Sequence, residues 1–190
     1  YNSASFCLSA LYSMAFLGGR SFHCCAGFLA FLLSVVCVKG FRKGMLAKPL
    51  LSDFVRIMGI YYLLNIFDEM ISPASDYFMV LLAFYVLIKW LELLERKEQS
   101  YFPYALLCVM GVMIVSVKLS GALLLLLALR PAWQMIREKR VGEILKFMGV
   151  GLLTAVPFLA RNILLSGWLV YPFTAIDLFD FDFKIPQGMA

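Results

Sequence analysis

Apolar runs separated by short charged segments make up most of the chain. A transmembrane helix needs about 20 mainly apolar residues, and somewhat shorter runs are accommodated when the bilayer thins or when flanking side chains snorkel to the interface. The pattern therefore predicts an all-α fold, a polytopic transmembrane helical bundle of about five to six helices with short spans and exterior loops. The candidate spans are residues 21–38, 50–67, 77–91, 104–117, 119–136 and 144–160.

Three features complicate this scheme. Residues 5–17 are apolar but short, which predicts a short helix or the end of a span. Residues 119–129 hold the purest apolar tract, and they can cross a membrane only if residues 131–136 continue the helix; a half-length or tilted helix is the alternative. Pro157 lies inside the last run and predicts a kink, which neighbouring helices tolerate in a membrane.

The composition excludes a soluble globular domain. The 190 residues are 63% hydrophobic and 15% charged, with a mean hydropathy of +0.87, whereas soluble domains are about 45–50% apolar and about 25% charged. We expect the excess apolar surface to face a lipid bilayer, and residues 1–190 to form a single transmembrane unit. The chain begins at Tyr1 and ends in the loop-like Ile185-Pro186-Gln187-Gly188, so we expect it to be a fragment of a longer protein.

The formal net charge of +5 is concentrated next to the apolar runs. Short basic loops beside spans mark the cytoplasmic side of a membrane, so this charge is a topology signal. The chain lacks a basic-aromatic motif typical of nucleic-acid binding, and we expect no nucleic-acid partner. The two basic segments contain Lys39, Arg42, Lys43 and Lys48, and Arg130, Arg137, Lys139 and Arg140.

Cysteine and histidine indicate little chemistry. The five cysteines are scattered mostly through apolar runs, with no spacing typical of a disulfide framework or a zinc site. We expect these thiols to be small buried hydrophobic groups. His23 is the only histidine, and we expect it to lie at the membrane interface.

The same topology gathers polar residues at the opposite, exterior side. The segment 67–77 places three carboxylates between two apolar runs, and ionisable groups beside hydrocarbon mark functional sites by default. Carboxylates next to cations at a membrane surface can deprotonate a sugar hydroxyl, bind a divalent cation or hold a phosphate. The residues that this topology places outside, from four helix ends, are Asp68, Glu69, Asp76, Lys118, Arg161 and Asn162.

Simpler structural roles compete with a functional role for these residues. Ser72 can cap a helix that has Pro73 at its first position and Asp76 near the positive end of its dipole, which leaves the two earlier carboxylates unexplained. Lys118 is either a snorkelling anchor or a cation that faces a cavity. Arg161 closes a span on the side where Arg is unusual, and its fork is suited to phosphate or carboxylate.

Two further pairs of side chains have open roles. Asp53 and Arg56 interrupt the run 50–67 three positions apart, and we expect them to pair on one helix face while they snorkel toward water. Trp168 and Tyr171 follow a Gly turn in a loop. This arrangement predicts ring anchors at the level of the lipid headgroups, with stacking on a sugar as the sharper alternative.

Several short motifs, taken in order, resemble a group of uncharacterised bacterial polytopic membrane proteins. The motifs are Tyr1-Asn2-Ser3-Ala4-Ser5-Phe6, Ser72-Pro73-Ala74-Ser75-Asp76, Lys118-Leu119-Ser120, Arg161-Asn162, Ser166-Gly167-Trp168-Leu169-Val170-Tyr171-Pro172 and Asp180-Phe181-Asp182-Phe183-Lys184-Ile185-Pro186. Their layout is similar to that of the GT-C membrane glycosyltransferases, which take sugars from polyprenyl-phosphate carriers. The catalytic acid of GT-C enzymes usually lies in the first exterior loop, and we expect this chain to start downstream of that loop. It also reads Gly167-Trp168-Leu169 where an ordinary member has Gly-Tyr-Pro.

The resemblance implies a multi-pass enzyme of the bacterial inner membrane that transfers a sugar from a polyprenyl-phosphate donor to a cell-envelope glycan acceptor. Asp68 or Glu69 would activate the acceptor hydroxyl or bind a divalent cation, while Lys118 and Arg161 would hold the donor phosphate. The other expected substrate-binding residues are Asp76, Asn162, Trp168 and Tyr171. A transporter or non-catalytic component of surface-polysaccharide assembly is the alternative. A third hypothesis is that these helices are a scaffold and that the active part lies elsewhere in the parent protein.

Overall fold

A computed structural model describes residues 8–14, 22–41, 46, 48–69, 74–171 and 176–186. Every regular element in these residues is a helix, which confirms the predicted all-α fold class. Residues 8–14 are helical, in the middle of the predicted short helix 5–17. The other elements are η1 (Phe22–Cys24), α2 (Cys25–Lys39), α3 (Leu51–Asn65), η2 (Phe67–Glu69), α4 (Ser75–Glu95), α5 (Tyr101–Val117), η3 (Leu119–Ala128), α6 (Leu129–Arg137) and α7 (Val141–Ser166).

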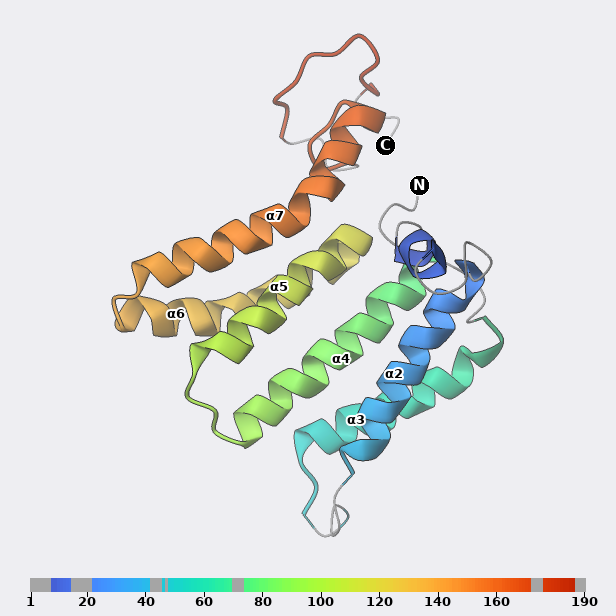
Figure 1. Cartoon of the computed structure of the whole chain (residues 1–190), viewed down its shortest axis with the longest axis vertical. Helices are drawn as coiled ribbons and strands as arrows, with labels where there is room; N and C mark the ends of the chain where they lie inside the picture. The colour runs from blue at the N-terminus through green and yellow to red at the C-terminus, as the bar shows by residue number, and fades with distance from the viewer. Residues whose placement is uncertain are drawn as a thin grey trace.

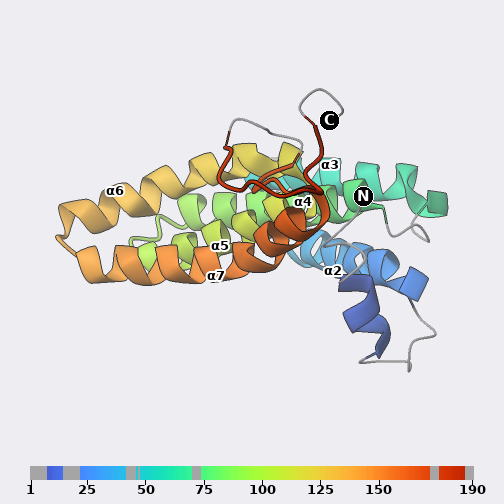
Figure 2. The same cartoon turned by 90° about the horizontal axis from the view of Figure 1, so that it is seen from above.

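Helix α4 organises the bundle. It packs against α2 and α3 on one side and against α5 on the other (Figure 1). Successive helices run in opposite directions, so that the end of α2 and the start of α3 lie at the same end of the bundle as the end of α4 and the start of α5. The start of α4 and the end of α5 lie at the other end. Helices α6 and α7 pack on α5 and on each other, and Figure 2 shows them on opposite sides of it.

Apolar side chains between the helices form the core. Leu33 and Cys37 of α2 pack with Leu81 of α4 in one cluster. Cys25 and Cys37 are buried as expected for thiols in an apolar run, but Cys24 is exposed and Cys108 is only partly buried, so the expectation is wrong for Cys24. Cys7 lies outside the described residues. The rings of Trp90 and Tyr104 meet edge to face with centroids 4.8 Å apart, which joins α4 to α5. Aromatic pairs of this geometry stabilise a contact by about 0.5–1.5 kcal/mol beyond the area they bury.

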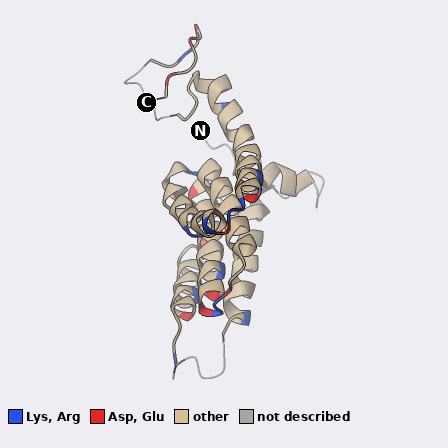
Figure 3. Cartoon of the chain, turned by 90° about the vertical axis from the view of Figure 1, so that its left-hand side faces the viewer, with Lys and Arg blue, Asp and Glu red and all other residues tan. Residues whose placement is uncertain are grey.

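The outer surface of the helices is apolar as well. Leu152 and Leu153 on α7 are 63% and 71% exposed, and the ribbon in Figure 3 carries charge only in short stretches. Three helices of the described residues are long and apolar enough to cross a membrane, namely Ser75–Glu95, Leu119–Arg137 and Val141–Ser166. Exposed apolar surface on this scale fits lipid rather than water, and the three helices indicate a multi-pass membrane protein.

The segment 119–137 shows how a short apolar run becomes long enough to cross. Its first part, η3, is a 3₁₀ helix of 10 residues, and α6 continues it for 9 more. A 3₁₀ helix rises about 2.0 Å per residue and an α-helix about 1.5 Å, so the whole segment extends roughly 33 Å. A hydrocarbon core is about 30 Å thick. The continuation through residues 131–136 is therefore confirmed, and the conformation of η3 adds length that the sequence pattern did not predict.

Other predicted spans differ from the observed helices in length. Helix α3 has only 15 residues, and at this length it is not among the helices long and apolar enough to cross. Helices α2 and α5 are apolar but shorter than a full span. Helix α7 runs to Ser166 instead of ending near Ala160, so Arg161 and Asn162 lie inside the helix. Pro157 lies within α7, and the helix changes direction along its length (Figure 1).

Candidate functional site

The predicted carboxylates lie where α3 ends and α4 begins. Asp68 and Glu69 belong to η2, and Asp76 lies in the first turn of α4. All three residues are exposed. We call this end of the bundle the acidic end, defined by these three residues, and the opposite end, where α2 and α4 finish, the basic end.

Side-chain contacts at the acidic end connect three elements. The hydroxyl of Tyr77 on α4 donates a hydrogen bond to a carboxylate oxygen of Glu69. The ammonium of Lys118, which directly follows α5, pairs with the carboxylate of Asp76. Asp68 is exposed and makes no contact of this kind with the rest of the described chain. The structure therefore brings carboxylates and a cation from the ends of η2, α4 and α5 to one end of the bundle.

The start of α4 lies just after the predicted cap. The helix begins at Ser75, and its N-cap Ala74 contributes no side-chain hydrogen bond. Ser72 and Pro73 themselves lie outside the described residues. Asp76 is in the first turn, as predicted, where the helix dipole favours a negative charge.

A second polar cluster forms where α7 ends. The hydroxyl of Ser166 donates to the carbonyl of Asn162 at 2.6 Å and accepts from the backbone N–H of Trp168 at 3.2 Å. The Asn162 amide lies 3.4 Å from the carbonyl of Leu169. The indole N–H of Trp168 donates to the carbonyl of Ile185 at 2.8 Å, which fixes the C-terminal segment against the helix end.

The ring of Trp168 serves this packing. The residue is 2% exposed, and the ammonium of Lys184 lies 4.2 Å from the ring centroid. The ring therefore holds the C-terminal segment instead of presenting a face to a sugar or to lipid headgroups. Arg161 and Tyr171 are half-buried beside this cluster, and no ion pair of Arg161 occurs among the described residues.

The two clusters remain separate. Helix α7 packs on α5 and α6 and makes no contact with α4 within the described chain, and Figure 1 shows its C-terminal part extending beyond the rest of the bundle. The contacts of Asn162, Ser166 and Trp168 all stay within the C-terminal segment. Asp68, Glu69, Asp76 and Lys118 thus form one candidate site, which the residues of α7 do not join.

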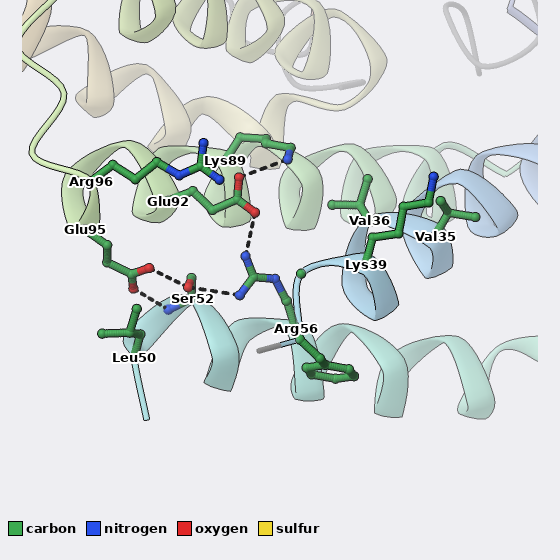
Figure 4. A pocket seen from close by; sticks show the side chains of 12 residues that line it. Val35, Val36, Lys39, Leu50, Ser52, Arg56, Lys89, Glu92, Glu95 and Arg96 are labelled. Atoms are coloured by element: carbon green, nitrogen blue, oxygen red, sulfur yellow. Dashed lines mark hydrogen bonds and ion pairs between the residues drawn. The ribbon is translucent and has the colours of Figure 1, made fainter. Parts of the chain in front are cut away.

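A third polar cluster, which the sequence did not predict, lies inside the basic end. Arg56 of α3 donates to Asp53 at 2.9 Å and to Glu92 of α4 at 2.5 Å. Glu92 also pairs with Lys89 at 2.9 Å. One carboxylate oxygen of Glu95 accepts from the backbone N–H of Ser52 at 2.9 Å and the other from its hydroxyl at 2.6 Å (Figure 4). These contacts form a network of charged and polar groups between α3 and α4.

This network corrects the expectation for Asp53 and Arg56. The two side chains pair on one helix face as predicted, but they do not snorkel toward water, because their side chains are only 2% and 4% exposed. The signal in the sequence was the pair of acids on α4. Glu92 and Glu95 are three apart and share one face of that helix, and their partners Arg56 and Ser52 are four apart and share one face of α3. Buried charges of this kind require partners, and α4 supplies them.

The described residues offer few side chains that could bind a metal ion together. No group of three or more His, Cys, Asp or Glu side chains gathers closely enough for a metal anywhere in the described residues. At the acidic end, Glu69 instead contacts Tyr77 and Asp76 contacts Lys118.

Comparison with known proteins places the chain in a family. Residues 1–190 match the domain of unknown function DUF8201 over the full length. The chain belongs to this family. No curated protein and no solved structure matches it. The family assignment covers the acidic end, the C-terminal cluster and the buried network alike.

Proposed function

We propose that this DUF8201 chain is part of a membrane glycosyltransferase, similar in layout to GT-C enzymes, that transfers a sugar from a polyprenyl-phosphate donor during cell-envelope polysaccharide assembly. The membrane would be the bacterial inner membrane. The contact between Tyr77 and Glu69 carries the proposal, because a hydroxyl on α4 orients an exposed carboxylate at one end of an apolar bundle. A general base needs this combination of access and fixed direction.

Each residue of the acidic end has a role in the proposed reaction. Glu69, or Asp68 beside it, accepts the proton of the acceptor hydroxyl as that oxygen attacks the sugar carbon bonded to the donor phosphate. Lys118 binds the phosphate that leaves with the lipid. The pair of Lys118 and Asp76 is exposed on both sides, at 38% and 59%. Exposed ion pairs add little stability, so a donor phosphate can replace Asp76 as the partner of the ammonium.

The decisive experiment uses the full-length natural protein, purified in detergent and supplied with polyprenyl-phosphate sugars and a glycan acceptor. We expect Glu69→Gln or Asp68→Asn to lower the transfer rate about 100-fold or more, the usual range for loss of a general base. Glu138→Gln removes an exposed carboxylate of the basic end and is the matched control. Undiminished transfer in both acidic-end variants would remove these residues from the mechanism.

A second candidate, a transporter or non-catalytic component of the same assembly, is supported by the network at the basic end. Charged side chains within a membrane bundle often mark a transport pathway, and Arg56 is buried between α3 and α4. Proteoliposomes distinguish the two candidates. Movement of a labelled lipid-linked glycan without any transferred product supports the transporter, whereas product formation supports the enzyme.

A further inference from the structure

A cavity of about 570 Å³ opens beside the network at the basic end. It lies between the ends of α2 and α4 and the start of α3. Four cationic side chains line it, and Figure 4 shows Lys89 and Arg96 on α4 flanking Glu92, with Lys39 at the end of α2 beside Val35 and Val36. The fourth is Arg56. The lining carboxylates are Glu92 and Glu95.

The partners of these charges leave positive charge at the cavity. Arg56 is shared by Glu92 and Asp53, and Glu92 also pairs with Lys89, whereas Glu95 keeps its negative charge because its partner Ser52 is neutral. The four cations of the lining therefore stand against three carboxylates, and one positive charge is left over. Within the described chain, Lys39 and Arg96 form no ion pair, and both are exposed at the cavity. The Nε–H of Arg56 is buried and lies against Gly40, so the cations of the lining that an anion can reach are Lys39, Lys89 and Arg96. A cavity with this lining suits an anion.

The apolar side of the cavity continues along the bundle. Val35 and Val36 of α2 line it and also line a second, almost entirely apolar cavity of about 340 Å³. That second cavity lies between α2, α4 and α5, where Leu82 of α4 and Met110 of α5 face it. At a rise of about 1.5 Å per residue, α4 covers roughly 22 Å between the level of Leu81 and that of Arg96. The two cavities thus adjoin along α2, where Val35 and Val36 line both, and one has a charged lining and the other an apolar one. We call the two adjoining cavities the path.

We propose that this path is a binding site for an anionic phospholipid. The phosphate of its headgroup lies between Lys39, Lys89 and Arg96, and one acyl chain lies along Val36 and Leu82. A soluble phosphate would use the cations and leave the apolar cavity empty. A neutral lipid would use the apolar cavity and leave the cations without a partner. An anionic lipid matches both, as do other basic pockets between transmembrane helices on the side of basic loops. This site does not depend on the transfer reaction proposed for the acidic end.

The test measures binding of phosphatidylglycerol to the purified full-length protein in detergent, by native mass spectrometry and by thermal stabilisation, with phosphatidylcholine and inorganic phosphate as parallel ligands. We expect phosphatidylglycerol to bind and stabilise the protein more strongly than either. The double variant Lys39→Gln, Arg96→Gln should weaken its apparent affinity about 25-fold, at about five-fold for each cation lost. Leu82→Trp, which fills the apolar cavity, should weaken it while leaving the headgroup cations in place.

The control is the double variant Lys97→Gln, Arg137→Gln, which removes two cations from the same end of the bundle that do not line this cavity. It should keep the affinity of the unmodified protein. An equal loss in the control would mean non-specific attraction and would overturn the proposal. Equal binding of phosphatidylcholine would overturn it too. The proposal would also be overturned if inorganic phosphate bound as tightly as the lipid and Leu82→Trp had no effect, because the site would then bind a soluble anion.

Lys39 and Arg96 are exposed, so the variant that replaces both should fold, and an unchanged far-UV circular dichroism spectrum checks this.

Discussion

A guanidinium nitrogen of Arg56 lies 2.5 Å from a carboxylate oxygen of Glu92, and this contact joins α3 to α4 within the bundle. Another nitrogen of the same group lies 2.9 Å from Asp53. Two acids from two helices therefore share one buried cation. Helix α3 carries the charges that prevent it from being a simple apolar span, and α4 compensates them.

Replacing Arg56 should destabilise the bundle strongly. Arg56→Met keeps much of the side-chain volume but leaves Asp53 and Glu92 without their shared cation, and breaking a buried ion pair in this way lowers the free energy of unfolding by about 3–5 kcal/mol. Denaturant titration of the purified protein in detergent measures the change. The control is Lys146→Met, which removes the exposed pair with Glu143 and should change stability little. Equal effects of the two substitutions would show that the Arg56 network does not hold the helices together.

The helices could largely be predicted from the sequence because apolar runs of this length have few alternatives in a membrane. The start and end of α4 and α5 lie close to the predicted limits. Which helices pair was harder to predict. Arg56 and Glu92 are 36 positions apart, and the local pattern of one helix does not identify the helix that packs against it. The extension of α7 past Arg161 was missed because a polar pair was interpreted as a helix end.

The residues of the candidate site could be named from sequence, but their grouping could not. Asp76 and Lys118 lie at helix ends whose positions follow from the order of the spans, and the structure pairs them. Trp168 reads as an interface ring in the sequence, yet it is buried by Ile185 and Lys184, which come 17 and 16 positions later. Such a contact depends on how a segment without regular structure folds back, which periodicity does not encode.

Gly40 should be intolerant of any side chain because of its position against Arg56. A Cβ atom there would lie 2.1 Å from the Nε of Arg56, so Gly40→Ala must displace the guanidinium from its partners. We expect a loss of about 1–3 kcal/mol in the free energy of unfolding, the usual range for overpacking. The measurement is the same denaturant titration, repeated in the Arg56→Met background.

A matched control for Gly40 lies in α2. A Cβ at Gly27 meets nothing within 4 Å, so Gly27→Ala should be neutral or slightly stabilising in the helix. The double variant Gly40→Ala, Arg56→Met should lose less free energy of unfolding than the two single variants lose together, because the shorter and uncharged Met can move away from the new Cβ. Full additivity would contradict the proposed clash.

Gly167 should be required for the C-terminal segment to dock. Its φ of 74° is left-handed, which favours glycine, and a Cβ there would lie 3.0 Å from the Cα of Lys184. Gly167→Ala should therefore separate the segment from α7 and weaken the bond from the Ile185 N–H to the Ser166 carbonyl. Trypsin cleavage after Lys184 should then become faster by about an order of magnitude or more, since about 1.4 kcal/mol of local opening is a tenfold change. Gly149→Ala, at an open position of α7, should leave the cleavage rate unchanged.

The side of the membrane on which each helix end lies can be measured directly. Single cysteines replace Asp68, Gln99, Arg137 or Arg161 in a cysteine-free variant, and a membrane-impermeant maleimide labels them in intact cells. Because successive helices alternate in direction (Figure 1), Asp68→Cys and Arg161→Cys should be labelled from outside, whereas Gln99→Cys and Arg137→Cys should be labelled only after the membrane is opened. The basic segment around Arg137 predicts this orientation through the bias of cytoplasmic loops toward Lys and Arg. Labelling of positions 68 and 161 from opposite sides would mean that an odd number of segments crosses between them. Reversed labelling of all four positions would keep the bundle but put the acidic end in the cytoplasm, where the proposed polyprenyl-phosphate chemistry at Glu69 would face the wrong compartment.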